Sequence, residues 1–394
     1  MFSIARQPKV RALPGLAAAC TLAAVAPVAA GCTGHATAPT DTITITRGNC
    51  GAAWAAPSGT PATFQLHNSG TVTAEVDLID PGTGGIYTEI EGLSPGTTRP
   101  MSVQLGRGSY AFRCLGEDTD AVTGPTVRLT VANPAQARAV QPVTRQDMFD
   151  PVNRYRAYVT AGLGTLSTDA HALAAALHGG DLNGSRAAWL TAHLAYERLG
   201  AAYGTFDDFA DKIDGGPDGL PGGVRDEDFT GLRRIEYGLW HGESPAALAG
   251  AGDQLAADVD ALREAFPQQQ TDPLDLTLRA HEIMENAERF ELTGDADQGS
   301  GTGLATVDAN LDGTGAVLDA IAPVLQPRYP GWSAMTSALA GVRALVEAQR
   351  HGDGGWTPPA ALALPDRQRL NAAVGDLLER LAPVAAIGEI RRTQ

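Results

Sequence analysis

Apolar and polar residues alternate with a period of two along much of residues 42–132. This alternation is typical of strands that bury one face and expose the other. Gly, Pro, Asn and Ser residues separate the alternating segments at the short spacing of an all-β domain. The clearest segments are 42–46, 63–66, 75–79, 102–105 and 127–131. We therefore predict that residues 42–132 form a β-sandwich.

Residues 146–390 follow a different period, with apolar residues three or four positions apart. The preceding stretch, 133–145, has two prolines and little periodicity, and is predicted to be a linker. Short connections rich in Gly, Asp and Pro favour antiparallel helices packed as bundles, without a sheet. Helices are expected near 148–178, 182–206, 228–240, 246–266, 274–293, 302–325, 331–351 and 361–388.

The N-terminal 31 residues have the features of an export signal. A basic start is followed by an apolar stretch that prolines interrupt, and by Ala-Ala-Gly directly before Cys32. Residues 1–31 are therefore expected to be a signal peptide, Cys32 to carry a lipid anchor, and residues 32–41 to be a tether. Ordinary cleavage near Ala30, giving a freely secreted protein, is the alternative.

The chain is acidic, with a formal net charge of −16. A surface of this sign repels phosphate backbones, which excludes nucleic acid as a partner. It attracts cations, although the same charge also serves plain solubility.

After removal of a leader and lipidation of Cys32, Cys50 and Cys114 are the remaining cysteines. The segment 106–114 resembles the last strands of cupredoxins, in which the Cys binds copper. A blue-copper site also needs two His and usually a Met, but no His or Met follows Cys114 within the sandwich. In an exported protein the two thiols are expected either to form a disulfide or to build a two-thiolate copper site.

The sandwich segments also carry two pairs of carboxylates, Glu75 with Asp77 and Glu89 with Glu91. Residues two apart point to the same face of a strand, so each pair can present two hard oxygen ligands to a cation. A solvated acidic face is the other interpretation.

Two His/Glu pairs stand out in the helical half. His193 and Glu197 are four residues apart, as are His281 and Glu285, so each pair shares one helix face. If the two pairs face each other in a bundle core, they can converge on one metal ion. Each pair taken alone can equally be a surface ion pair.

Further carboxylates lie near these pairs in the sequence. Glu236 sits in an apolar run, where a buried carboxylate needs a cation or an Arg partner. Asp207, Asp208, Asp211 and Asp214 follow the first pair closely enough to fold back over it. Glu236 and Asp214 are therefore candidate ligands, with Asp208 as an additional one.

Four motifs of this half resemble the imelysin domain of EfeO-type iron-uptake proteins. They are WLTAHLAYERLGAAYGTFDD at 189–208, KID at 212–214, DFTGLRRIEYGLW at 228–240 and DANLDG at 308–313. A cupredoxin-like sandwich followed by an imelysin domain is the layout of that family, so the resemblance covers nearly all of residues 42–390.

The resemblance implies two helical bundles with a metal site between helices. Its ligands would be Glu197, Asp214 and Glu285, with His193 adjacent and Glu236 in the second motif. It also implies an exported, monomeric component of an Efe system, held at the membrane beside an iron permease and a haem-dependent peroxidase. The expected metal is iron, as Fe²⁺ or Fe³⁺, with copper or zinc as further possibilities.

One position departs from the family pattern. The second motif of the family reads Gly-x-His-x-x-Glu, whereas this chain has Arg233 in place of the His. A guanidinium is a permanent cation that cannot coordinate a metal. Either the His is dispensable, or the site of this chain is weaker, altered or gated by an anion.

Imelysin-like domains have also been classed with metallopeptidases. A zinc peptidase needs a His-Glu-x-x-His helix or an equivalent, but the nearest string, at 281–285, ends in Glu. We therefore expect a metal-binding protein rather than an enzyme. The alternatives are a hydrolase of the imelysin class and a lipoprotein that binds acidic polysaccharide; the net charge argues against the latter.

Overall fold

The computed structural model of the chain describes residues 42–393 except 58, 118 and 353–354. The predicted signal peptide, the lipidation site Cys32 and the tether lie outside the described residues. None of the helices in the described part combines the length and the apolar composition that a bilayer crossing requires.

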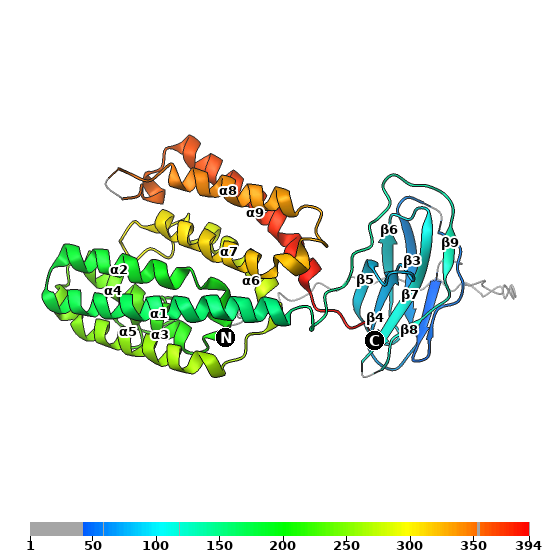
Figure 1. Cartoon of the computed structure of the whole chain (residues 1–394), viewed down its shortest axis with the longest axis horizontal. Coiled ribbons are helices and arrows are strands. Elements are labelled where there is room, and N and C mark those ends of the chain that lie inside the picture. The colour runs from blue at the N-terminus through cyan, green and yellow to red at the C-terminus, as the bar shows by residue number, and fades with distance from the viewer. Residues whose placement is uncertain (1–41, 58, 118, 353–354, 394) are drawn as a thin grey trace, which may run out of the picture. The chain divides into compact units, whose positions relative to one another are not determined.

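Two sheets form the N-terminal part of the described chain (Figure 1). The strands are β1 Thr42–Thr46, β2 Asn49–Cys50, β3 Ala62–Asn68, β4 Ala74–Ile79, β5 Ile86–Leu93, β6 Thr98–Val103, β7 Gly108–Gly116, β8 Val122–Thr123 and β9 Val127–Leu129. One sheet has the order β2-β1-β3-β6 and the other β5-β4-β7-β8, with β9 also paired to β7. The predicted β-sandwich is confirmed.

The alternation in the sequence becomes the alternation of burial. Along β3 every second side chain is buried, and Phe64 from this strand meets Trp54 and Phe112 of β7 edge to face. These aromatic contacts fill the space between the sheets. Strand β5 was not among the predicted segments, because its first four residues are only half-buried and its pairing with β4 contains irregularities.

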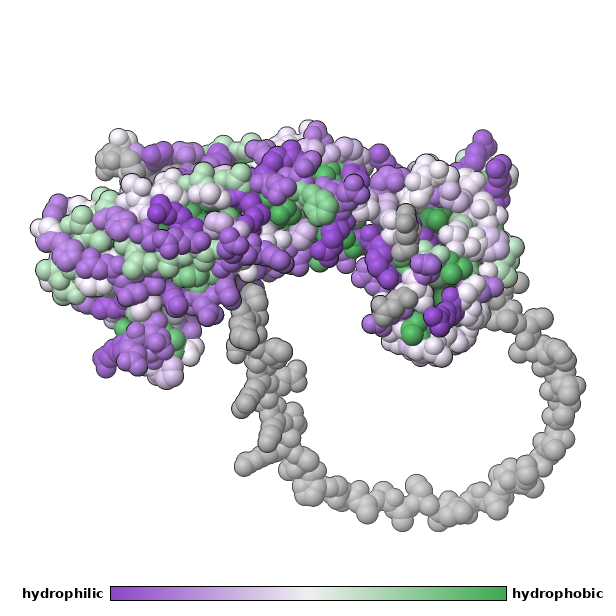
Figure 2. Space-filling model, turned by 60° about the horizontal axis from the view of Figure 1, so that its bottom comes forward, coloured by the Kyte–Doolittle hydropathy of each residue, from purple (hydrophilic) through white to green (hydrophobic). Residues whose placement is uncertain are grey.

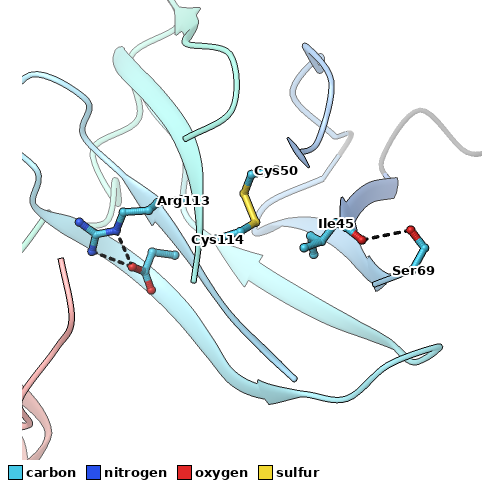
Figure 3. Close-up of a disulfide and its surroundings, with 6 residues drawn as sticks. Ile45, Cys50, Ser69, Arg113 and Cys114 are labelled. Atoms are coloured by element: carbon cyan, nitrogen blue, oxygen red, sulfur yellow. Dashed lines mark hydrogen bonds and ion pairs between the residues drawn. A yellow bond between two sulfur atoms is a disulfide. The ribbon is translucent and has the colours of Figure 1, made fainter. Parts of the chain in front are cut away.

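Cys50 of β2 and Cys114 of β7 form a disulfide with their Cα atoms 5.6 Å apart (Figure 3). The bond joins the two sheets of the sandwich. Neither sulfur is a thiolate in this state, so the structure contains the disulfide rather than the two-thiolate copper site.

The C-terminal part is helical from residue 149 to 388, as predicted. Its α-helices are α1 Phe149–Gly179, α2 Leu182–Glu197, α3 Phe209–Asp214, α4 Gly231–Trp240, α5 Pro245–Ala265, α6 Pro273–Asn286, α7 Gly303–Leu325, α8 Trp332–Glu347 and α9 Leu364–Gly388. In Figure 1, α1, α2, α4 and α5 lie side by side with the short α3, and α6 to α9 form a second group. Helix α7 packs against α1 and α2 of the first group and against α6 and α8 of the second.

Local signals explain why several helices begin where predicted. Pro245 and Pro273 occupy first positions, and the preceding Ser244 and Asp272 accept a hydrogen bond from the first turn. The expected helix 182–206 is shorter: α2 ends at Glu197 and a 3₁₀ segment follows. The short α3 was not predicted as a helix.

The helical half has one apolar core, whose largest side chains include Trp189, Tyr155 and Phe266. On the face shown in Figure 2, hydrophilic residues are interspersed with small separate apolar patches. The charged residues buried beneath such a surface therefore need an explanation of their own, because burying a charge is costly unless it is paired.

Candidate metal-binding site

Helix α2 places His193 and Glu197 in the interior, where they are 1% and 7% exposed. The two side chains lie one helical turn apart, with His193 Nε2 3.8 Å from a Glu197 oxygen. Trp189 stacks flat against the imidazole, and Thr306 of α7 lies 3.0 Å from Nε2. The stacking and this hydrogen bond fix the orientation of the imidazole.

Asp214, at the end of α3, reaches the same place through a close contact between α3 and α4. Its Oδ1 lies 3.8 Å from His193 Nδ1. Gly231 opens α4 with a φ of +73°, and a Cβ there would lie 2.3 Å from the Ile213 carbonyl oxygen. Only glycine allows this approach, so Gly231 is what brings the start of α4 beside Asp214.

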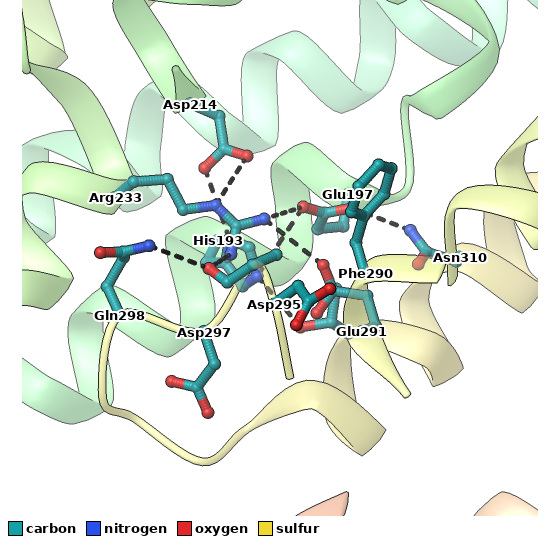
Figure 4. A network of polar contacts seen from close by, with 12 residues as sticks. His193, Glu197, Asp214, Arg233, Phe290, Glu291, Asp295, Asp297, Gln298 and Asn310 are labelled. Carbon is teal, nitrogen blue, oxygen red and sulfur yellow. Dashed lines mark hydrogen bonds and ion pairs between the residues drawn. The ribbon is translucent and has the colours of Figure 1, made fainter. Parts of the chain in front are cut away.

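Helix α4 contributes Arg233 and Glu236, three residues apart on one face. The guanidinium contacts Asp214, Glu197 and Glu291 at 3.2, 3.4 and 3.5 Å (Figure 4). It also lies 3.9 Å from Glu236. Glu236 is 1% exposed, and its Oε1 accepts hydrogen bonds from two backbone amides of the loop before α7. Arg233 therefore lies among four carboxylates.

Two further residues complete this polar cluster. A π-helical turn over Ala287–Glu291 follows α6 and directs Glu291 inward. From α7, the Asn310 amide donates to Glu197 Oε2 at 2.8 Å. Gly313 permits the close approach of α7 to α2, because a Cβ at this position would lie 2.8 Å from the Arg198 carbonyl oxygen.

The buried charges do not balance. Burial raises the pKa of Glu236 to about 7, and burial together with the charges of Glu197 and Asp214 raises the pKa of Glu291 to about 7, in spite of Arg233. The pKa of Arg233 also rises, because four carboxylates outweigh the effect of its burial. The charged form of Arg233 is stabilised by all four carboxylates. Each carboxylate, in contrast, is stabilised by a single positive charge that it shares with the other three.

The same excess of negative charge affects the pKa of the His193 imidazole. Burial acts to lower the pKa of His193, but Asp214 and Glu197 outweigh it and the pKa is raised above 6.5. The arrangement as a whole favours additional positive charge.

Three buried polar atoms of the cluster have no hydrogen-bond partner in the described part of the chain: His193 Nδ1, Asp214 Oδ1 and Glu236 Oε2. One potential ligand atom from each of His193, Glu197 and Asp214 lies within 4.8 Å of the other two. Imidazole nitrogen and carboxylate oxygen are donors that iron, zinc and manganese accept. Such unpartnered atoms are costly unless a ligand satisfies them, so the residues fit a metal ion.

A cavity of about 180 Å³ connects this cluster to the surface. Glu197, Asp214, Arg233 and Glu291 line its inner part, and the exposed Phe290 lies at its outer part. The volume is sufficient for a hydrated cation.

Not every predicted ligand belongs to the cluster. His193, Glu197, Asp214 and Glu236 converge as expected, but Glu285 is half-exposed and pairs with His281 and Arg289. His281 lies on the same outward face, and Asp208 is exposed at the start of α3. The two His/Glu pairs therefore do not face each other, and the pair of His281 and Glu285 is the surface ion pair that was the alternative.

Sequence reasoning missed Glu291, although a signal for it exists. The buried positions of α6 include Ala280 and Met284, Ala287 at the start of the π-helical turn continues this face, and four residues further it reaches Glu291. Glu285 falls between these positions, on the polar face.

Three of the four carboxylates predicted in the sandwich, Asp77, Glu89 and Glu91, pair with an arginine. Asp77 lies opposite Arg113 on β7, which donates two hydrogen bonds of 2.7 and 2.9 Å to Asp77 Oδ2. Glu75, Glu89 and Glu91 can each offer an oxygen within 4.8 Å of the others, and burial with these neighbouring charges raises the pKa of Glu75 to about 7. Arg391 donates to Glu89, so part of this group is already neutralised.

The helical half also matches known proteins. The profile of the imelysin (peptidase M75) family matches residues 151–384, which include every residue of the buried cluster. The iron uptake system component EfeO of Escherichia coli O157:H7, of Escherichia coli K12 and of Shigella flexneri is in each case 26% identical over 302 residues. These alignments cover 77% of this chain and 79% of each relative.

Proposed function

The chain belongs to the imelysin family, and we propose that it is an extracytoplasmic iron-binding component of an iron-uptake system. The observation that carries the proposal is the meeting of His193, Glu197 and Asp214 in the interior, where His193 Nδ1 and Asp214 Oδ1 have no hydrogen-bond partner among the described residues. The named function of the relatives supports iron as the cargo.

The chemistry of the cluster agrees with this cargo. Carboxylate oxygens are hard donors that suit Fe²⁺ and Fe³⁺, and an imidazole strengthens binding of the softer Fe²⁺. Zinc and copper accept the same donors, so selection for iron would depend on geometry and on the metals available. Glu236 and Glu291 supply further negative charge next to the three ligands.

The leader and Cys32 would export the chain and hold it on the outer side of the membrane by a lipid, with residues 32–41 as tether. A carrier in this position can pass iron to a membrane permease, with a haem-dependent peroxidase as a further component. A monomer is sufficient for this role, since all residues of the cluster come from one chain.

Glu197→Ala in the full chain tests the proposal, with the metal-free protein titrated with Fe²⁺ under anaerobic conditions. The variant is expected to lose stoichiometric binding while its helical circular dichroism persists. Glu285→Ala is the matched control, because it removes an exposed glutamate outside the cluster and should bind as the wild type does. Unchanged binding by Glu197→Ala would remove this residue from the site, and a wild type that binds no iron would refute the function.

A hydrolase remains the competing function because of the family to which the chain belongs. The sequence closest to a zinc-peptidase helix lies on the surface, where His281 and Glu285 pair with each other at 3.8 Å. Chelator-sensitive cleavage of casein by the wild type that Glu236→Gln abolishes would support the hydrolase.

A further inference from the structure

Arg233 fills the position in which a metal ion would be expected. The residue is 9% exposed, and its guanidinium lies between Asp214 on one side and Glu197 and Glu291 on the other (Figure 4). One further hydrogen bond, from Nη1 to the Ala296 carbonyl oxygen, is 3.1 Å long. The carboxylates are thus arranged around a cation that the chain itself supplies.

The contacts of Arg233 are unlike those of an arginine in a dedicated ion pair. Arg113 in the sandwich holds a single carboxylate, that of Asp77, with two hydrogen bonds of 2.7 and 2.9 Å. Arg233 spreads over four carboxylates at 3.2 to 3.9 Å and makes no short charge-assisted bond with any of them. The cluster surrounds the guanidinium without matching its fork geometry.

The surroundings also allow Arg233 to move. Its side chain lines the cavity of about 180 Å³ that leads outward from Glu197 and Asp214. Glu282 also lines this cavity; its side chain is one-third exposed and already pairs with Arg279 at 2.9 Å, so a displaced guanidinium would share this carboxylate with Arg279. A metal ion that enters can therefore take over the carboxylates while the guanidinium shifts within the same cavity.

We propose that Arg233 is a displaceable internal cation that competes with the metal ion for Glu197 and Asp214. This inference rests on the proposed function and concerns how tightly the site holds its metal ion. In the empty site the guanidinium partly neutralises four carboxylates and stabilises the fold. In the loaded site it must give up some of these contacts, so metal affinity is lowered and release to a partner becomes easier.

Arg233→Met in the full chain tests the inference. Metal-free protein is titrated with Fe²⁺ under anaerobic conditions, and the melting temperature is measured with and without the metal. Because a unit positive charge within about 4 Å of the ligands is removed, affinity should rise at least tenfold. The metal-free variant should melt below the wild type, and the stabilisation by Fe²⁺ should be larger than in the wild type.

Arg234→Met is the matched control, since Arg234 is adjacent on α4 but pairs with Glu243 away from the cluster. The affinity of Arg234→Met for Fe²⁺ should be within twofold of the wild-type affinity. An arginine with a purely structural role would lower stability in Arg233→Met without raising affinity, and an arginine that assists binding would lower affinity; either result overturns the inference.

The outcomes also separate this inference from the function on which it rests. If the wild type binds iron and Arg233→Met binds no more tightly, only the competitor role of Arg233 falls. If neither binds, the proposed function falls with it. If metal-free Arg233→Met does not fold, refolding in the presence of Fe²⁺ decides: recovery of the native helical signal supports displacement, and failure to recover it refutes the inference.

Discussion

Glu236→Gln should stabilise the helical half at alkaline pH and leave it nearly unchanged at acidic pH. Glu236 is buried, and its pKa is raised to about 7 from an ordinary value of 4.5, first by burial. The amide oxygen of a glutamine can still accept the two backbone hydrogen bonds that Glu236 Oε1 accepts from Gln298 and Ser300. The substitution therefore removes the charge and keeps the contacts.

The sign follows from the protons bound in each state. Between pH 4.5 and 7 the folded state holds a proton on Glu236 that the unfolded state has lost, so stability falls as the pH rises through this range. The shift corresponds to a loss of about 3 kcal/mol above pH 7. For a domain of this size, such a difference changes the melting temperature by on the order of 10 °C.

The assay is thermal unfolding of the metal-free chain, followed by circular dichroism at 222 nm, at pH 5 and pH 8. Wild type should melt lower at pH 8, and Glu236→Gln should recover the part of the difference that Glu236 causes, about half, because the pKa of Glu291 is raised by a similar amount. Glu243→Gln is the matched control; it breaks a surface pair with Arg234 and should cost about 1 kcal/mol or less at either pH. Equal effects of Glu236→Gln at pH 5 and pH 8 would refute the reasoning, because they would show that the charge of Glu236 is not what destabilises the fold.

Two predictions concern the stability of the sandwich. In both, the free energy of unfolding is measured by hydrogen exchange of the strand amides under increasing urea. Asp77→Ala leaves the buried Arg113 without its partner and should lower the free energy of unfolding by about 4 kcal/mol. Glu91→Ala, at a half-exposed position, should lower it by less than about 1 kcal/mol. Similar losses in the two variants would contradict the buried pairing of Asp77 with Arg113. Replacement of Cys50 and Cys114 by alanine opens a link across 64 residues and should cost about 4 kcal/mol, and unchanged protection would show that the bond does not stabilise the sandwich.

The parts of the fold that sequence predicts well are those with a strong local signal. Alternation marks β1, β3 and β4, and prolines after Ser244 and Asp272 mark the starts of α5 and α6. Strand β5 and helix α3 are not predicted from the sequence, because tertiary packing, rather than a regular apolar pattern, determines them. A short element can be stable in the fold without a periodic sequence of its own.

The site was predictable where it depends on helix periodicity and not where it depends on distant contacts. His193 and Glu197 share a face because they are four residues apart, and this needs no tertiary information. Glu291 is directed inward by a π-helical turn, and Asp214 reaches the cluster through the close contact that Gly231 allows. Neither spacing nor composition reveals which of Glu285 and Glu291 turns inward unless the buried face of α6 is followed to its end.

The charge balance of the cluster is the property that most needs a functional reason. Replacing buried ion pairs by apolar side chains of similar volume often stabilises a fold, so selection for stability alone does not favour four carboxylates around one guanidinium. The cluster keeps unpartnered atoms on His193 and Asp214 and opens to a cavity, which a purely structural network would fill or close. Two positive groups, Arg233 and His193, are too few for the negative charge around them, and an added metal cation is the simplest partner that corrects both the charge and the missing contacts. A cation that is bound only strongly enough to offset this shortfall of positive charge can also be released. A carrier has to release its ion, whereas a structural metal site does not.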